Sequence, residues 1–135
     1  MKSGQAYLRQ IHEKDIESYA EHIYQKDAEG YINVLQLKDG QTYNVFNTKV
    51  DKVVTVVKRL EGEKDTYITP NTFFIPVRKA DNIRHFRALF IDIDLEDRIY
   101  SKNEVVGKAY IMADEGLIPR PTMAVDSGRG IHLYW

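Results

Sequence analysis

One apolar run that ends in two carboxylates constrains the fold of this chain more than any other feature. The run is Ala88-Leu89-Phe90-Ile91-Asp92-Ile93-Asp94. Because side chains along a β-strand alternate between its two faces, Asp92 and Asp94 share one face. The other face carries Leu89, Ile91 and Ile93, which we expect to enter a core. The Cα atoms of the two aspartates lie about 7 Å apart in such a strand, so both carboxylates can reach one divalent cation.

Two interpretations of this acidic pair stay open. Carboxylates on one face repel each other, and each loses hydration where the strand is buried. A bound cation offsets both costs, which favours a metal site at Asp92 and Asp94. The alternative is a strand end that emerges into water, where both acids are solvated and bind nothing.

The second informative stretch is Asp126-Ser127-Gly128-Arg129-Gly130-Ile131-His132, which lies between two short predicted strands. Its glycines favour a turn that lets a ligand approach the backbone closely. The Ser127 hydroxyl, the Arg129 guanidinium, the His132 ring and the backbone N–H groups together suit a polyphosphate. An ordinary hairpin is the alternative. A metal pair beside an anion cradle makes up the two halves of a nucleotidyl-transfer site.

Composition limits the class of protein. A hydrophobic fraction of 43% supports a folded core, and a net charge of −1 argues against a surface that is basic all over. The chain has no cysteine, which excludes disulfides and thiolate zinc sites and fits a reducing compartment. No apolar run is long enough to span a bilayer, and we expect no signal peptide. We therefore expect a cytoplasmic protein with no membrane partner.

Local signals predict a mixed order of helices and strands. The first predicted elements are a helix over 11–28 and two strands over 31–37 and 41–46, joined by a turn at Asp39-Gly40. A helix over 50–60, capped by Thr48 and Asp51, and a strand over 66–69 follow. A last helix begins at the Ser101/Glu104 capping box and ends at Gly116. The crossover from the acidic strand through this last helix tends to return the chain to the same sheet. We expect Asp92, Asp94 and the final hairpin to share that sheet.

The segment 71–87 is the most basic part of the chain. Its candidate nucleic-acid contacts are Arg78, Lys79, Arg84 and Arg87. These cations could track a phosphate backbone or a triphosphate. A solvated loop with helix-flanking charges explains them equally well.

With these motifs in place, the chain resembles the archaeo-eukaryotic primase superfamily, and more narrowly the primase or primase-polymerase domains of plasmid and phage replication proteins. That superfamily has a hydrophobic strand ending in Asp-x-Asp, matched here by 89–94. Its second motif is a small residue, then any residue, then histidine, and it is matched by 127–132. The resemblance covers roughly 70–135. The small position is Gly130 rather than serine, so the hydroxyl contact falls to Ser127, and a third acidic motif has no counterpart before Trp135.

The resemblance implies an α+β fold with an RRM-like, mixed or antiparallel sheet, helices packed on one face, and a small αβ module before it. Residues 1–135 then form one domain, with 1–69 as the N-terminal module and 70–135 as the half of the catalytic core that carries both motifs. The chain ends at Trp135 directly after an apolar strand, so we expect the N-terminal fragment of a longer replication protein.

The resemblance also implies two-metal phosphoryl transfer on a DNA template. Mg²⁺ or Mn²⁺ would sit at Asp92 and Asp94, while Ser127, Gly128, Arg129, Gly130 and His132 would hold the nucleotide, with Asp92, Asp94 and His132 as the catalytic set. The implied partners are nucleoside triphosphates, single-stranded DNA and a helicase domain in the parent chain. Without the third acid, we expect weak nucleotide binding and little or no polymerisation by these 135 residues.

Two other classes of function stay open. A non-catalytic module could dock single-stranded nucleic acid or a replisome partner on the same sheet, since Phe90 shares the face of Asp92 and Tyr134 could share that of His132. A metal-dependent phosphodiesterase or nuclease would explain the acids but not the Ser-Gly-Arg-Gly-x-His turn.

Overall fold

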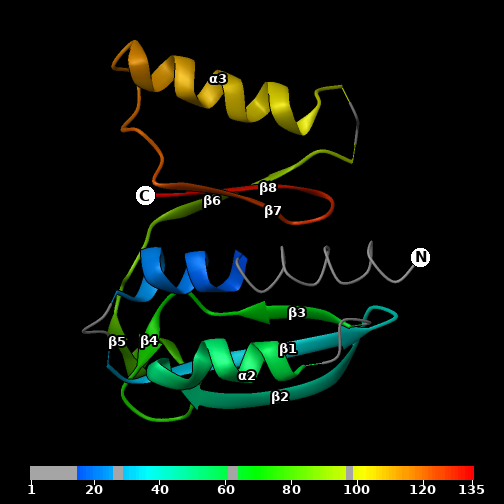
Figure 1. The fold of residues 1–135 in the computed structure, drawn as a ribbon, viewed down its shortest axis with the longest axis vertical. Helices are drawn as coiled ribbons and strands as arrows, with labels where there is room; N and C mark the ends of the chain where they lie inside the picture. The colour runs from blue at the N-terminus through cyan, green and yellow to red at the C-terminus, as the bar shows by residue number, and fades with distance from the viewer. Residues whose placement is uncertain (1–14, 26–28, 61–63, 97–98) are drawn as a thin grey trace. The chain divides into compact units, whose positions relative to one another are not determined.

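The computed structural model describes residues 15–25, 29–60, 64–96 and 99–135. The chain divides into two compact units, Met1–Arg87 and Ala88–Trp135. Antiparallel sheets and helices occur in both, so the predicted α+β class is confirmed (Figure 1). No helix within the described residues is long and apolar enough to cross a membrane.

The first unit is built on an antiparallel sheet. Its strands are β1 (Tyr31–Lys38), β2 (Gln41–Lys49), β3 (Asp65–Ile68), β4 (Thr72–Phe73) and β5 (Ile83–His85). The order is β2-β1-β4-β5, and β3 also pairs with β1. The predicted hairpin is confirmed: Asp39 and Gly40 have φ of 52° and 74°, the left-handed conformations that a two-residue turn between antiparallel strands requires.

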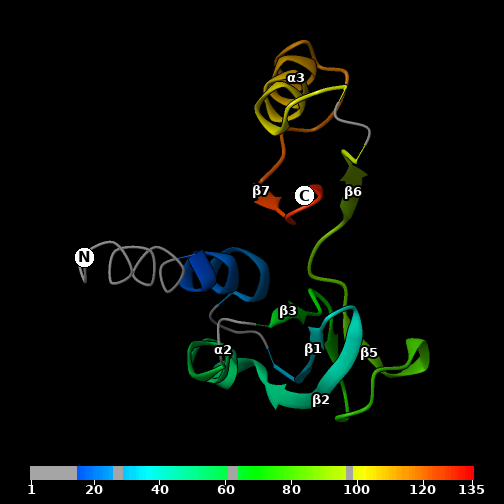
Figure 2. The same cartoon turned by 90° about the vertical axis from the view of Figure 1, so that its right-hand side faces the viewer.

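One face of this sheet carries the core of the first unit. Ile32 and Val34 are 0% exposed, and alternation along β1 puts them on the same face. Residues 15–24 are helical, within the range predicted for the first helix, and that helix lies with α2 (Val53–Arg59) on one side of the sheet (Figure 2). Both helices contribute buried side chains, Ile23 and Val53, and the Tyr24 hydroxyl donates to the carbonyl of Thr69 at 2.6 Å.

The predicted helix over 50–60 is present, but its predicted cap is wrong. The chain first makes a 3₁₀ turn, η1 (Val50–Lys52), and only then the α-helix α2. Thr48 belongs to β2, where it pairs with Ile32, so its side chain caps no helix. Lys49 is the N-cap residue, with no side-chain cap hydrogen bond. The pairing of β2 with β1 therefore keeps Thr48 in the strand, although the local sequence is typical of a helix cap. The sequence also predicts that this helix stops at Gly62, which lies outside the described residues.

The basic segment belongs to the first unit. It contains β4, the short 3₁₀ turn η2 (Ala80–Asn82) and β5. Because β4 pairs with β1 and β5 with β4, residues up to His85 extend the first sheet, and the unit ends at Arg87. The two compact units therefore meet at 87/88, further along the chain than the predicted module boundary at 69/70. The assignment of 1–135 to one functional domain stays a prediction.

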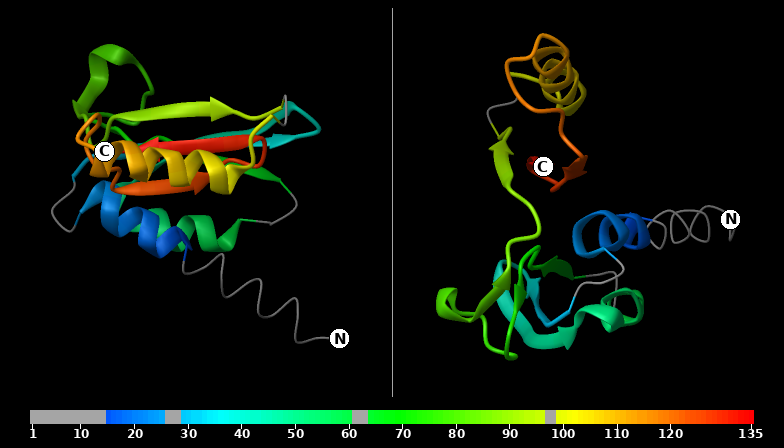
Figure 3. Two further views of the ribbon diagram at one scale, coloured as in Figure 1. Left: turned by 90° about the horizontal axis from the view of Figure 1, so that it is seen from above. Right: turned by 90° about the vertical axis from the view of Figure 1, so that its left-hand side faces the viewer.

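The second unit is a three-stranded antiparallel sheet with one helix. Its elements are β6 (Phe90–Asp94), α3 (Lys102–Asp114), β7 (Met123–Asp126) and β8 (Gly130–Tyr134). The strand order is β6-β8-β7, and α3 lies on one side of the sheet (Figure 3). The crossover thus returns the chain to the sheet that holds Asp92 and Asp94, as predicted.

Helix α3 has the ends that its sequence predicts. The Ser101 hydroxyl accepts from the N–H of Glu104, and the Glu104 carboxylate accepts from the N–H of Ser101, which makes a full capping box. That backbone N–H and the Ser101 side chain hold the pKa of Glu104 below its usual value. At the other end Gly116 has φ of 75°, and its N–H donates to the carbonyl of Ala113.

The core of the second unit corrects one expectation. Ala109, Ile131 and Leu133 are its buried residues, and Ile93 packs against them. Leu89 and Ile91, predicted to share that core, are 74% and 48% exposed. The reason is the strand order: α3 packs over β8, and β6 is an edge strand of the described sheet, so its apolar side chains receive little cover.

Candidate nucleotide and metal site

The register between β6 and β8 brings the two sequence motifs together. Asp92 lies opposite His132, and Asp94 lies opposite Gly130. Directly opposed residues of antiparallel strands point to the same face, so Asp92, Asp94 and His132 share the face away from Ile131 and Leu133. Two motifs separated by more than thirty residues therefore occupy one surface of one sheet.

His132 is held between neighbours on this face. Its Nε2 lies 3.4 Å from Oδ1 of Asp92, and its Nδ1 lies 3.4 Å from the hydroxyl of Tyr134. The Phe90 ring contacts both rings, stacking on Tyr134 at 5.4 Å between centroids and lying 5.9 Å from His132. The imidazole is thus oriented by an acid on the next strand and by two aromatic rings.

The carboxylates differ in their contacts. The Asp92 side chain is 63% exposed and contacts His132. Asp94 ends the strand, and its Oδ1 accepts the backbone N–H of Glu96 at 3.0 Å, which fixes one oxygen, while its other oxygen has no hydrogen bond to any described residue. An exposed, partly ordered carboxylate pair can accept a cation without first giving up a buried ion pair.

The turn from Ser127 to Gly130 is closed by its own hydrogen bonds. The N–H of Ser127 donates to the carbonyl of Gly130 at 3.0 Å, and the N–H of Gly130 donates to the Ser127 hydroxyl at 3.1 Å. The Ser127 oxygen therefore already shapes the turn, while its O–H can still donate to a ligand.

Gly130 is required by packing. A Cβ at this position would lie 1.9 Å from the carbonyl oxygen of Ile93 and 3.1 Å from the Cα of Asp94. The small residue of the motif is therefore needed because the acidic strand passes directly beside it. Gly128 has φ of 90° and open space around it, so its requirement is conformational.

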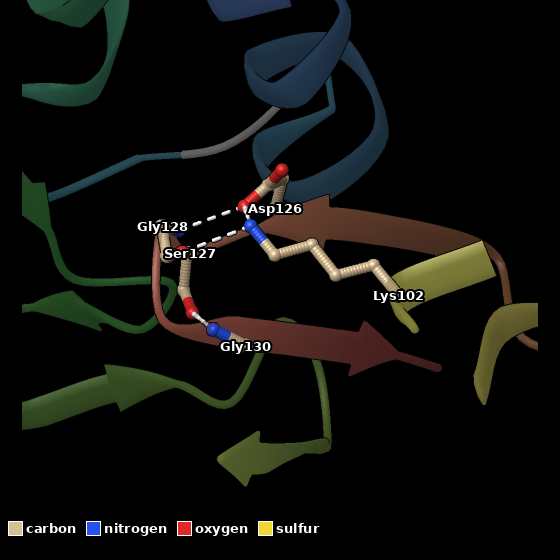
Figure 4. A network of polar contacts seen from close by, with 5 residues as sticks. All are labelled: Lys102, Asp126, Ser127, Gly128 and Gly130. Atoms are coloured by element: carbon tan, nitrogen blue, oxygen red, sulfur yellow. Dashed lines mark hydrogen bonds and ion pairs between the residues drawn. The ribbon is translucent and has the colours of Figure 1, made fainter. Parts of the chain in front are cut away.

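Helix α3 fastens the turn through a contact that the sequence analysis missed. The Lys102 ammonium donates to Oδ1 of Asp126 at 2.6 Å and to the carbonyl of Gly128 at 2.8 Å (Figure 4). Asp126 also accepts the N–H of Gly128 at 2.8 Å. Lys102, and after it the Gly128 N–H, hold the pKa of Asp126 below its ordinary value. A lysine in the first turn of a helix gives no indication in the sequence that its side chain will contact a turn more than twenty residues away.

Arg129 lies at the exposed tip of the turn. Its side chain is 82% exposed and pairs with Glu96 at 3.2 Å, while its carbonyl accepts the N–H of Leu95. An ion pair this exposed contributes little, so a phosphate could replace Glu96 at small cost. Leu95, Glu96, Lys102 and Arg129 also line an open cavity of about 810 Å³ beside the turn.

The donor set suits Mg²⁺ or Mn²⁺ in type but is small. Two carboxylates on one exposed face are the oxygen ligands that hard divalent cations prefer. Within the described residues, no three His, Asp or Glu side chains gather around one point as metal ligands. The metal at Asp92 and Asp94 stays a prediction.

The four predicted nucleic-acid contacts belong to the first unit and differ among themselves. Arg84 pairs with Glu29 at 2.6 Å, and Arg87 hydrogen-bonds the Nδ1 of His85 at 3.1 Å. Arg78 and Lys79 are exposed on the segment before η2. Arg84 and Arg87 thus have structural partners, and the two exposed cations are the better candidates for a ligand.

Comparison with known proteins adds one relative. Over 74 residues, 55% of the chain, the sequence is 37% identical to a protein of Clostridium perfringens named "Replication protein". That match covers 18% of the relative's length, so the chain corresponds to a small part of it. No family model matches the chain, and no solved structure matches it. More than half of this chain is therefore similar to part of a replication protein.

Proposed function

We propose that this chain carries the nucleotide-binding part of a DNA primase or primase-polymerase domain, a nucleotidyltransferase of the kind found in plasmid and phage replication proteins. The supporting observation is that Asp92 and His132 lie 3.4 Å apart on neighbouring strands, with Asp94 opposite the glycine that ends the Ser127–Gly130 turn. The similarity to a replication protein supports a role in replication.

Each residue then has a distinct role. Asp92 and Asp94 would hold Mg²⁺ or Mn²⁺, which when bound supplies charge stabilisation for the transferred phosphoryl group and the leaving pyrophosphate. Arg129 would exchange Glu96 for a phosphate oxygen. The Ser127 O–H and the His132 Nε2–H would donate to the triphosphate. His132 is oriented for this by Tyr134 and Phe90.

The implied partners follow from this chemistry. They are nucleoside triphosphates, a single-stranded DNA template and, in the parent protein, a helicase domain. With two carboxylates as the acidic ligands, we expect weak nucleotide binding and little or no primer synthesis by the 135-residue chain.

A second candidate is a non-catalytic module that binds single-stranded nucleic acid. The observation that favours it is the ring cluster of Phe90, His132 and Tyr134 on the face of the sheet opposite α3, in which Phe90 is 47% exposed and rests on the buried Tyr134. Aromatic side chains on an antiparallel sheet are the usual platform for unpaired bases. In that case Asp92 and Asp94 have no metal to hold.

Isothermal titration calorimetry with a nucleoside triphosphate separates the two candidates. We expect the wild-type chain to bind more tightly in MnCl₂ than in EDTA. Asp92→Ala should abolish the manganese dependence. His132→Ala should weaken binding by between about tenfold and a hundredfold, because a hydrogen bond to a charged group contributes about 1.5–3 kcal/mol. Glu115→Ala, an exposed acid at the end of α3, is the matched control and should bind as wild type.

If both Asp92→Ala and His132→Ala bind nucleotide as the wild type does, the nucleotidyl-transfer proposal fails. Binding of an oligonucleotide that is lost in Phe90→Ala, without any metal-dependent nucleotide binding, would favour the second candidate.

A further inference from the structure

The sheet of the first unit has a second face that the proposed nucleotide site does not use. Leu35 of β1 lies opposite Val45 of β2 and opposite Tyr67 of β3, so these three side chains share one face. A register irregularity in β2 sets Thr42 and Tyr43 together opposite Leu37, which lies on the same face as Leu35, so Tyr43 joins them. We call Leu35, Tyr43, Val45 and Tyr67 the tyrosine face. It lies opposite the buried Ile32 and Val34.

The tyrosine face is open although it is apolar. Tyr43, Val45 and Tyr67 are 57%, 53% and 47% exposed, and Leu35 between them is half-buried. Single exposed apolar residues need no explanation, but a contiguous group on three neighbouring strands is typical of a binding surface. Two of the four side chains are tyrosines, whose ring faces can stack on a flat ligand.

Cations surround this face. The Lys64 ammonium lies 3.8 Å from the centroid of the Tyr43 ring. Lys49 is exposed and lies opposite Tyr31, on the same face as Leu35. Asp65 sits opposite Leu37 at the same end as Lys64, and Asp39 lies in the turn between β1 and β2. Lys49 and Lys64 therefore place positive charge at the two ends of this face.

The predicted basic residues reach the margin of the same face. Asn47, also on this face, donates from Nδ2 to the carbonyl of Pro76 at 2.8 Å, which ties the following loop to the sheet. The exposed Arg78 and Lys79 follow Pro76 by two and three residues. The segment 74–82 lies on the opposite side of the sheet from α2 (Figure 2).

We propose that the tyrosine face binds single-stranded nucleic acid, with bases stacked on Tyr43 and Tyr67 and phosphates contacted by Lys49, Arg78 and Lys79. Stacking rings combined with a positively charged margin are the usual means of binding unpaired strands without sequence preference. An apolar protein partner would match the rings but not the surrounding cations. The inference extends the proposed function by naming a surface for the template, yet it concerns residues outside the nucleotide site.

Fluorescence anisotropy with a labelled 20-mer tests this proposal. The 135-residue chain is titrated into oligo(dT) and oligo(rU) of equal length in magnesium-free, low-salt buffer. We expect binding that weakens with added salt, and a loss of about tenfold or more in the double variant Tyr43→Ala/Tyr67→Ala. Tyr43→Phe/Tyr67→Phe keeps the rings and should bind as wild type.

Two further variants test the charge contribution and the location of the stacking rings. Lys49→Gln should reduce the slope of log K against log salt by about 1. Phe86→Ala removes an aromatic ring that is 74% exposed in the same unit but outside the tyrosine face, and it should bind as wild type. A preference for oligo(dT) or oligo(rU) identifies the nucleic acid, and either supports the proposal.

Three outcomes would overturn the inference. The first is that Tyr43→Ala/Tyr67→Ala binds the oligonucleotide within twofold of wild type. The second is that the wild type binds neither oligonucleotide. The third is that the wild type binds no oligonucleotide but forms a concentration-dependent dimer in analytical ultracentrifugation, which the double variant abolishes. Asp92→Ala keeps the two proposals apart: it should lose manganese-dependent nucleotide binding and retain oligonucleotide binding.

Discussion

Gly130 shows how one residue joins the local turn to the sheet. Sequence analysis assigned it to a turn that leaves room for a ligand, and the turn is present. The stronger constraint comes from the neighbouring strand, since the carbonyl oxygen of Ile93 occupies the space that a Cβ would need. That constraint could not be read from the sequence, because Ile93 and Gly130 come together only through strand pairing.

We expect Gly130→Ala to destabilise the second unit by about 1–3 kcal/mol, since the added methyl group must push β6 away from β8. Gly107→Ala is the matched control: Gly107 lies inside α3, and an added methyl group there would meet nothing within 4 Å, so alanine should stabilise by about 0.5–1 kcal/mol. Urea denaturation of both variants measures the difference. Equal stability of Gly130→Ala and wild type would show that the strands can separate freely here.

At the scale of elements, contiguous signals predicted most of the secondary structure. The Asp39-Gly40 hairpin, the capping box at Ser101 and the stop at Gly116 all depend on residues close together in the chain, and all are present. The cap at Thr48 failed because pairing with β1 extends β2 to Lys49. The short strands β4 and β5 were not predicted, since two or three residues carry no periodicity.

The bridge from α3 to the turn should respond to pH. The ammonium of Lys102 lowers the pKa of Asp126 from its ordinary value of 3.8. A carboxyl whose folded-state pKa is lowered adds stability above the ordinary value, and that stability disappears as the pH falls through the lowered value. Lys102→Met should raise the pKa of Asp126 and remove this contribution. Asp126 is 62% exposed, so the loss at neutral pH should stay below about 1 kcal/mol.

Carboxyl-detected NMR titration measures the pKa of Asp126 directly, and thermal unfolding between pH 2 and 7 follows the stability. The control is Lys108→Met, which removes another exposed lysine of α3 and should leave the Asp126 titration unchanged. An unaltered Asp126 titration in Lys102→Met would mean that the Gly128 N–H alone lowers the pKa.

At the scale of the whole molecule, the chain forms two units with separate cores. The first is centred on Ile32 and Val34, and the second on Ile131 and Leu133. Residues 70–87 join the first unit because β4 and β5 extend its sheet. The tyrosine face and the candidate nucleotide site therefore belong to different units.

Separate cores should unfold locally in separate steps. We expect Val34→Ala to cost about 1.5–3 kcal/mol and to reduce hydrogen-exchange protection mainly in β1 to β5. Leu133→Ala should act mainly on α3 and β6 to β8. Mass-spectrometric hydrogen exchange on both variants tests whether each affects its own unit. A uniform loss of protection across both units in either variant would contradict this expectation.

The sequence alone determined most of the longer helices and strands, and the sharing of one sheet by the acids and the final hairpin. These follow from alternation, capping and crossover rules, whereas the α+β class was implied by the resemblance of the two motifs to a known family. Tertiary structure alone decided that Asp92 faces His132, that Lys102 reaches Asp126, and that Leu89 and Ile91 stay exposed. Strand register, helix placement and edge position bring together residues far apart in the chain, and no local pattern specifies those pairings.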